Sequence, residues 1–196
     1  VIKQDIEPLV EKILQYMDEK NGGFKGAPKF PQLYIFDTVF YFYNKNKKNT
    51  FLDVVRKLLN NISSKGIYDH LGGGISRYTV DEQWVVPHFE KMLYDNILFV
   101  RTLNNYLINN KDEKLKSKLI QTINFINDEF INNKKLLGSA YDADSEGIEG
   151  KYYVWSNEEI KKLLGNDIDI FKKKYFVTKE GNFEGSNILI EKDNFE

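Results

Sequence analysis

The sequence predicts an all-α protein, an incomplete α/α toroid of helical hairpins with short β-hairpin insertions. Three observations lead to this fold class. Amphipathic helical segments alternate with largely apolar ones, glycine-bearing loops separate them, and a short proline motif occurs twice at equivalent places. Repeated side by side, such hairpins build a double ring of helices, and three of them make about half of a six-hairpin ring.

The first hairpin is expected in residues 1–46. Residues 5–20 place their apolar side chains on one helical face, and the run Asn21-Gly22-Gly23 ends that helix because glycine adopts left-handed conformations without steric cost. After the loop FKGAPKFPQ, the run LYIFDTVFYFYN is apolar or aromatic on nearly every side. A helix without a polar face is expected to be buried all round.

The second hairpin is expected in residues 49–109. Residues 49–65 form an amphipathic helix, and we expect Pro87 to open a largely apolar helix that runs to about Asn109. Between these helices, residues 74–79 and 83–86 flank a polar turn, which is typical of a β-hairpin.

A repeated motif supports this division. Ala27-Pro28-Lys29-Phe30 returns as Val86-Pro87-His88-Phe89, and each copy follows a pair of glycines and precedes an apolar segment. We interpret the two copies as the same local structure at the start of two inner helices.

The third hairpin is expected in residues 112–165. An amphipathic helix over 112–133 is followed by a second β-hairpin, in which residues 139–141 and 151–155 flank DADSEGIEG. Ser156 with Glu159 three residues later predicts a capping box for a short helix. A further short helix at 167–176 and a strand at 187–190 complete the expected elements.

Composition excludes several classes of function. The chain of 196 residues has a net charge of −1, which gives no reason to expect a nucleic-acid surface or an anionic membrane as partner. It contains no cysteine and two histidines, so disulfides, thiol catalysis and cysteine- or histidine-only metal cages are not expected. No apolar run is long enough to cross a bilayer, and no signal peptide is recognised, so we expect a cytoplasmic location. Because the first residue is Val1, we expect a piece of a longer protein.

The predicted helix at Pro87 carries a polar stripe. His88, Lys91 and Asp95 are spaced three, four and seven apart, so they would share one helical face, which we expect at the mouth of the toroid. The alternative is that these side chains are only hydrogen-bonded near a helix start.

The loop before that helix is suited to a sugar. Aromatic ring faces alternate there with groups that hydrogen-bond to hydroxyls, and loops held by a rigid scaffold are where binding sites concentrate. A histidine with a nearby carboxylate can also act as a general base. The candidate binding residues of this loop are Asp69, His70, Arg77, Tyr78, Glu82 and Trp84. The alternative for its aromatic residues is packing within the β-hairpin.

The later loop brings carboxylates at alternate positions. Asp142, Asp144 and Glu146 resemble the start of an EF-hand, but the twelfth position is Tyr153 rather than a bidentate glutamate, so we predict no metal site. Two interpretations of Asp142 and Asp144 remain: solvated charges at a loop tip, or paired carboxylates at the ring mouth.

Three stretches together resemble a known family. GGFKGAPKFPQ, YDHLGGGISRYTVDEQWVVPHFEKMLYDN and SAYDADSEGIEGKYYVW occur in order between about residues 21 and 155, and they resemble the YyaL and spermatogenesis-associated thioredoxin-domain family. The resemblance implies an N-terminal thioredoxin-like domain followed by a helical toroid similar to N-acylglucosamine 2-epimerases and six-hairpin glycosidases. It also implies that this chain is a fragment, 1–196, of the toroid without the thioredoxin-like domain.

Sugar-epimerase-like toroids use histidines as acid and base groups with arginine and glutamate nearby. By this resemblance His88 and Arg77, with Glu82 or Glu90, are the corresponding residues, and a second histidine would be His70 or come from the missing half.

The leading hypothesis is a carbohydrate-active domain of the epimerase, isomerase or glycoside hydrolase type. Its chemical groups would be His88, Asp95, Arg77, Asp142 and Asp144, and its sugar-stacking faces would be Tyr78, Trp84 and Tyr152. No cofactor is expected.

The alternative is a non-catalytic scaffold that binds a partner, such as the thioredoxin-like domain or the rest of the toroid. An open half-ring also exposes apolar surface, which predicts a homodimer.

Overall fold

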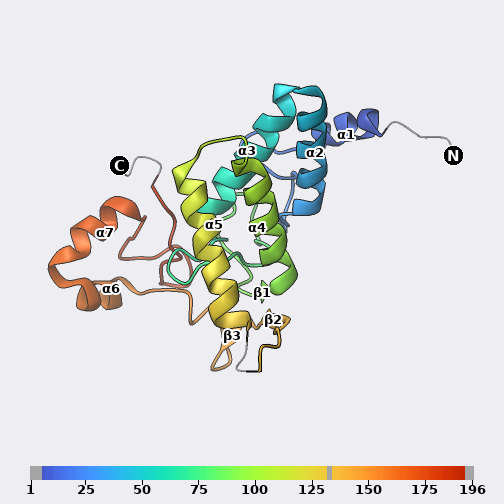
Figure 1. Ribbon diagram of the computed structural model, residues 1–196. Helices are drawn as coiled ribbons and strands as arrows, with labels where there is room; N and C mark the ends of the chain where they lie inside the picture. The colour runs from blue at the N-terminus through green and yellow to red at the C-terminus, as the bar shows by residue number, and fades with distance from the viewer. Residues whose placement is uncertain (1–5, 132–133, 193–196) are drawn as a thin grey trace.

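A computed structural model describes residues 6–131 and 134–192. Helices α2 to α5 pack together, and Figure 1 shows α6 and α7 as a separate lobe on the side of α5 away from α1. The named strands are two residues long, and β1 to β3 lie beyond the N-terminal end of α4. The described part of the chain is therefore mainly helical, as predicted.

The first helical segment is shorter than predicted, and the second is less buried than predicted. α1 (Glu7–Ile13) continues into a 3₁₀ turn (Leu14–Tyr16) within the predicted range 5–20. α2 (Leu33–Asn46) exposes Tyr34 by 57% and Tyr41 by 63%. The expectation that this helix is buried on every side is wrong, because one side of it faces away from the rest of the described chain.

The remaining large helices pack against α2 and against its neighbours. α3 (Asn49–Ser64) packs on α2, and α4 (Leu93–Leu107) packs on both α2 and α5. α5 (Glu113–Phe125) ends in a π-helical turn at Ile126–Phe130 and also contacts α3. Hairpin α2–α3 therefore lies beside hairpin α4–α5, whereas the predicted hairpins of residues 1–46 and 49–109 join α1 to α2 and α3 to α4.

The segment 87–92 is extended, so the prediction that Pro87 opens a helix is wrong. Pro87 pairs with Thr79, and the His88 N–H donates to the Tyr78 carbonyl oxygen at 3.1 Å. These backbone groups are satisfied by strand pairing rather than by a helical turn, and α4 begins only at Leu93.

Two predicted features change as a result. The first β-hairpin pairs residues 77–80 with 86–90, not 74–79 with 83–86, as hydrogen bonds from Arg77 N to Glu90 O and from Val80 N to Val86 O show. The helical stripe of His88, Lys91 and Asp95 does not form, because only Asp95 lies on α4.

The second predicted hairpin also has different partners. β2 (Ala140–Tyr141) pairs with β1 (Lys91–Met92), not with residues 151–155. The DADSEGIEG loop instead makes its own hairpin, β3 (Asp144–Ser145) with β4 (Ile148–Glu149). Glu146 and Gly147 have φ of 55° and 74° between these strands, which is the backbone of a two-residue turn that matches strand twist.

The C-terminal lobe agrees with its sequence signals. Ser156 and Glu159 form the predicted capping box of α6 (Asn157–Leu164), and α7 (Ile168–Lys174) lies within the predicted range 167–176. A 3₁₀ turn at Gly165–Asp167 joins the two helices. The predicted strand at 187–190 is reduced to a single bridge between Asn187 and Trp155.

Candidate functional site

Three extended segments meet beside the N-terminal end of α4. Thr79 pairs with Lys29 on one side and with Pro87 on the other, so the two copies of the repeated motif flank the same strand. The rings of Phe30, Tyr78 and His88, one from each segment, form a continuous stack. Phe30 lies 4.7 Å from Tyr78, and Tyr78 lies 4.9 Å from His88, measured between ring centroids.

The imidazole at the end of this stack has a carboxylate partner. His88 Nδ1 lies 2.9 Å from Glu149 Oε1, and both side chains are partly exposed, by 36% and 48%. Glu149 comes from β4, and no sequence pattern predicted its role, because its position depends on the hairpin inside the DADSEGIEG loop. The contact fixes the ring orientation, since Nδ1 faces the carboxylate.

A second group of polar side chains lies on the paired segments 77–80 and 86–90 and on the start of α4. Arg77 Nη1 donates to Glu90 Oε2 at 3.2 Å. Burial raises the pKa of Asp95 to about 6, although the nearby Arg77 guanidinium opposes the shift. Arg77 Nε and Asp95 Oδ2 are both buried and make no hydrogen bond among the described residues. Such atoms indicate a place where a ligand or another polar group binds.

We call this set the Arg77–His88 surface. It consists of Phe30, Arg77, Tyr78, His88, Glu90, Asp95 and Glu149. The stacked rings lie beside one carboxylate, that of Glu149, and the Arg77 guanidinium lies beside two carboxyl groups, those of Glu90 and Asp95. Together these groups can stack on a ligand ring, hydrogen-bond to hydroxyls and move protons.

Other predicted site residues lie around a separate cavity. Asp69, His70 and Tyr152 line a cavity of about 400 Å³, together with Phe89 and Trp155. The residues of this lining do not include Arg77, Tyr78, His88 or Asp95. The structure therefore divides the predicted site between two places.

Two predicted binding residues are buried in the interior. Trp84 is 0% exposed, its Nε1–H donates to the Asn21 carbonyl oxygen at 2.9 Å, and its ring packs against the Lys29 ammonium. It therefore presents no stacking face to a ligand. Lys91 is 2% exposed and forms an ion pair with Asp69, so it holds the loop in place rather than facing solvent.

The remaining predicted carboxylates do not join either place. Asp142 and Asp144 are exposed, and neither side chain has a hydrogen bond to another described residue. Glu82 is also exposed, and its backbone carbonyl oxygen accepts a hydrogen bond from Lys29 Nζ. The loop-tip interpretation of Asp142 and Asp144 fits this geometry, although their role stays a prediction.

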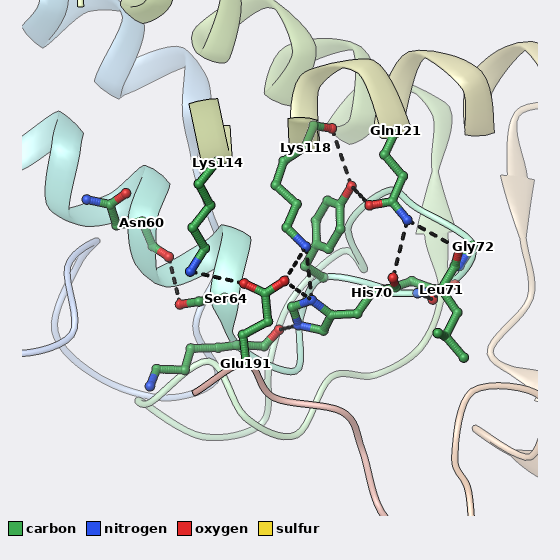
Figure 2. A network of polar contacts seen from close by, with 12 residues as sticks. Asn60, Ser64, His70, Leu71, Gly72, Lys114, Lys118, Gln121 and Glu191 are labelled. Carbon is green, nitrogen blue, oxygen red and sulfur yellow. Dashed lines mark hydrogen bonds and ion pairs between the residues drawn. The ribbon is translucent and has the colours of Figure 1, made fainter. Parts of the chain in front are cut away.

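His70 belongs to a buried polar network, shown in Figure 2. His70 Nε2 lies 3.0 Å from the Lys65 carbonyl oxygen, which can only accept, so Nε2 carries the proton. Burial lowers the pKa of His70, so the ring is neutral and its Nδ1 accepts from Lys118 Nζ at 3.1 Å. Lys118 also donates to Glu191 at 2.8 Å, and this network joins α5 to the C-terminal segment.

Two further properties of the described residues bear on function. Among them, no cluster of three or more histidine, aspartate or glutamate side chains has the geometry of a metal site. Within the same part of the chain, each helix is too short or too polar to span a bilayer.

Proteins of similar sequence cover most of this chain. Spermatogenesis-associated protein 20 of Homo sapiens is 30% identical over 189 residues, which are 86% of this chain and 24% of that protein. An uncharacterised protein of Caenorhabditis elegans is 33% identical over 168 residues, which are 76% of this chain and 22% of that protein. The chain thus spans about a quarter of the length of these relatives. No protein-family model matches the sequence.

Solved structures of similar fold are sugar epimerases. Cellobiose 2-epimerase from Spirochaeta thermophila has a TM-score of 0.58 at 16% identity, and the match covers 71% of this chain and 41% of that one. A sugar epimerase from a ruminal bacterium has a TM-score of 0.59 at 17% identity, over 83% and 46% of the two chains. At this identity the likeness shows the fold, and the predicted partial α/α toroid is confirmed.

Proposed function

The chain is a homologue of the spermatogenesis-associated protein 20 family, and from this premise we propose that its Arg77–His88 surface binds a sugar and contributes acid and base groups to an epimerase or isomerase reaction. One observation carries the proposal. Arg77 Nε and Asp95 Oδ2 are buried without a hydrogen-bond partner in the described chain, and Arg77 directly precedes Tyr78, whose ring stacks on His88.

The surface offers both kinds of contact that a sugar uses. The exposed side of the Phe30, Tyr78 and His88 stack can pack on the apolar face of a pyranose ring. The unpaired Arg77 Nε–H can donate to a hydroxyl oxygen, and the unpaired oxygen of Asp95 can accept from a hydroxyl.

The same groups suit proton transfer. Epimerisation next to a carbonyl requires a base to remove the carbon-bound proton of the open-chain sugar, so that its electron pair passes to the carbonyl oxygen as an enediolate. A proton must then return to the opposite face of that carbon, which leaves the atom count unchanged. We assign the base to His88, oriented by Glu149, and the acid to Asp95, whose raised pKa lets it hold a proton near pH 6.

Two observations favour this class over glycoside hydrolysis. The sugar epimerases named above share the fold. A glycosidase needs two carboxyl groups on either side of the bond that is cleaved, whereas the side chains of Asp142 and Asp144 are exposed and make no hydrogen bond to another described residue.

A scaffold function is the second candidate, and the exposed side of the inner helices favours it. Tyr34 and Tyr41 on α2 lie on the surface, as do Ile97 on α4 and Ile108 directly after it. Such an apolar surface is suited to binding another segment or protein.

Isothermal titration with cellobiose and mannose tests the proposal. We expect millimolar binding to the wild type and at least tenfold weaker binding to His88→Gln and Asp95→Asn, with no change for Lys173→Gln on the exposed side of α7. Exchange of the C2 proton of a bound sugar for deuterium from solvent, followed by NMR, reports the reaction itself. Absence of binding to any sugar, with retained affinity for a thioredoxin-like domain, would support the scaffold instead.

A further inference from the structure

The cavity of about 400 Å³ lies apart from the Arg77–His88 surface. It forms where the loop 66–72 meets the segments 145–155 and 188–189, and its volume is within the range that binds small molecules. Five aromatic side chains line it: Tyr68, Phe89, Tyr152, Tyr153 and Trp155.

The charged groups of the lining already have partners within the chain. Asp69 pairs with Lys91 at 2.7 Å, and its other oxygen accepts from two backbone N–H groups. Lys151 pairs with Glu146. Glu159 accepts from both the N–H and the hydroxyl of Ser156. An anionic ligand would therefore find no unpaired cation among these groups.

Neutral donors remain available instead. Ser76, Tyr153 and Trp155 line the cavity, and among the described residues no hydrogen bond is found for the hydroxyls of Ser76 and Tyr153 or for the indole N–H of Trp155. Burial raises the pKa of Tyr153, so this phenol stays a neutral donor. Partly buried donors of this kind are normally paired, so their occurrence together around one cavity indicates a ligand that supplies acceptors.

We propose that this cavity binds a neutral sugar at a site separate from the Arg77–His88 surface. Ring faces and uncharged donors are the two features that sugar recognition combines, and the internal pairing of the charges disfavours phosphorylated or acidic ligands. The inference does not depend on the proposed reaction, because none of the groups assigned to acid or base chemistry lines the cavity.

The two tryptophans provide an internal probe. The Trp84 indole N–H is buried and donates to the Asn21 carbonyl oxygen, whereas Trp155 lines the cavity and its indole N–H has no hydrogen-bond partner among the described residues. In a ¹H–¹⁵N spectrum of the whole chain, addition of methyl β-glucoside should move the Trp155 indole signal and leave the Trp84 signal in place. This glycoside has no open-chain form and so cannot undergo the epimerisation proposed above.

Variants separate the two sites. Tyr153→Phe keeps the ring that stacks on Phe89 but removes the donor, and it should weaken methyl β-glucoside binding by about 3- to 10-fold. Tyr16→Phe, at an exposed tyrosine outside the cavity, should have no effect, and His88→Gln should leave the Trp155 titration unchanged.

Three results would overturn the proposal. They are an unmoved Trp155 signal with both methyl β-glucoside and cellobiose, wild-type affinity in Tyr153→Phe, and tighter binding of glucose 6-phosphate than of the neutral glucoside. Loss of epimerisation in His88→Gln with an intact Trp155 titration would leave this inference standing, so the two proposals fail independently.

Discussion

The Lys91 ammonium lies 2.7 Å from the Asp69 carboxylate in the interior, between the rings of Phe125 and Tyr153. Lys91 Nζ also donates to the Gly73 carbonyl oxygen at 2.8 Å. One buried side chain thus ties the glycine-rich loop to α5 and to the segment that carries Tyr153. Both candidate sites depend on this arrangement, because the loop leads into Arg77 and lines the cavity.

Removal of this ammonium should destabilise the fold. Lys91→Met leaves the Asp69 carboxylate without its counter-charge in a largely buried position, and we expect a loss of about 3 kcal/mol in the free energy of unfolding. The matched change Lys116→Met affects an exposed pair with Glu113 and should cost less than about 1 kcal/mol. Urea unfolding followed by circular dichroism measures both, and equal losses in the two variants would contradict this role of Lys91.

The position of the His88 segment depends on Gly150. A Cβ atom at Gly150 would lie 2.4 Å from the Phe89 ring, and Phe89 itself has a left-handed φ of 62°. Gly150→Ala should therefore displace Phe89 and cost about 3 kcal/mol.

Gly147→Ala is the control for this change. Gly147 has a similar φ of 74° but nothing within 4 Å of its added Cβ, so only the backbone penalty of about 1 kcal/mol is expected. Thermal unfolding of both variants, with sugar titration at the Arg77–His88 surface, measures the difference. If Gly150→Ala is no less stable than Gly147→Ala, the packing account fails.

The C-terminal segment is held by Glu191. Burial opposes its ionisation, but its ion pairs with Lys118 and Lys114 outweigh burial and hold the pKa well below the usual range. Because the folded-state pKa is lowered, this stabilisation is present above the usual value of 4.5 and is lost as the pH falls further.

Glu191→Gln should thus lower stability near neutral pH by about 3 kcal/mol and have a smaller effect in strong acid. Glu180→Gln, at an exposed position before this segment, should change stability by less than about 0.5 kcal/mol. Unfolding midpoints as a function of pH give the comparison, and a pH-independent difference would argue against the network.

Asp95 should titrate near pH 6. Its folded-state pKa is raised from 3.8 to about 6, so its contribution to stability is present below pH 3.8 and is lost as the pH rises through about 6. Asp95→Asn should therefore be more stable than the wild type above pH 6, by about 1 kcal/mol after allowance for partial exposure, and equal to it in acid. Carbon-13 NMR of the Asp95 carboxyl group gives the midpoint directly, and a midpoint at or below 3.8 would refute the assignment of Asp95 as the acid.

The exposed side of α2 and α4 should mediate self-association. A charge placed among its apolar side chains, as in Tyr41→Asp, should shift a dimer to monomer in sedimentation equilibrium. Leu163→Asp, on exposed α6 in the separate lobe, should not. A wild type that is monomeric at high concentration would rule out the dimer.

Helical periodicity predicted much of the fold, because amphipathic spacing and capping residues act locally. The capping box of Ser156 and Glu159 and the helices α2 to α5 follow from such signals. The structure of the segment 87–92 could not be predicted from such signals, since its proline and apolar residues are equally compatible with a helix start and with a paired strand. The strand forms because Thr79, distant in the sequence, supplies backbone partners.

The candidate site was predictable in residue type but not in grouping. Arg77 lies near Asp95 and Glu90, and Tyr78 stacks on His88, which contacts Glu149, so these predicted residues fall into two groups along one pair of strands rather than on one helical face. Trp84 and Lys91 carry the same chemical groups, yet long-range packing places both in the interior. Glu149 could not be found from sequence, because its contact with His88 depends on a turn within another loop.

The chain has three arginines, and this makes the central claim directly measurable. Arg101 Nε donates to Asp37 and an Arg56 Nη donates to Asp53, whereas Arg77 Nε has no partner among the described residues. A ¹H–¹⁵N spectrum of the arginine Nε–H groups, recorded as cellobiose is added, should therefore show the Arg77 signal moving with saturation while the signals of Arg56 and Arg101 stay in place. An Arg77 signal that remains fixed at saturating sugar would contradict a sugar site at the Arg77–His88 surface.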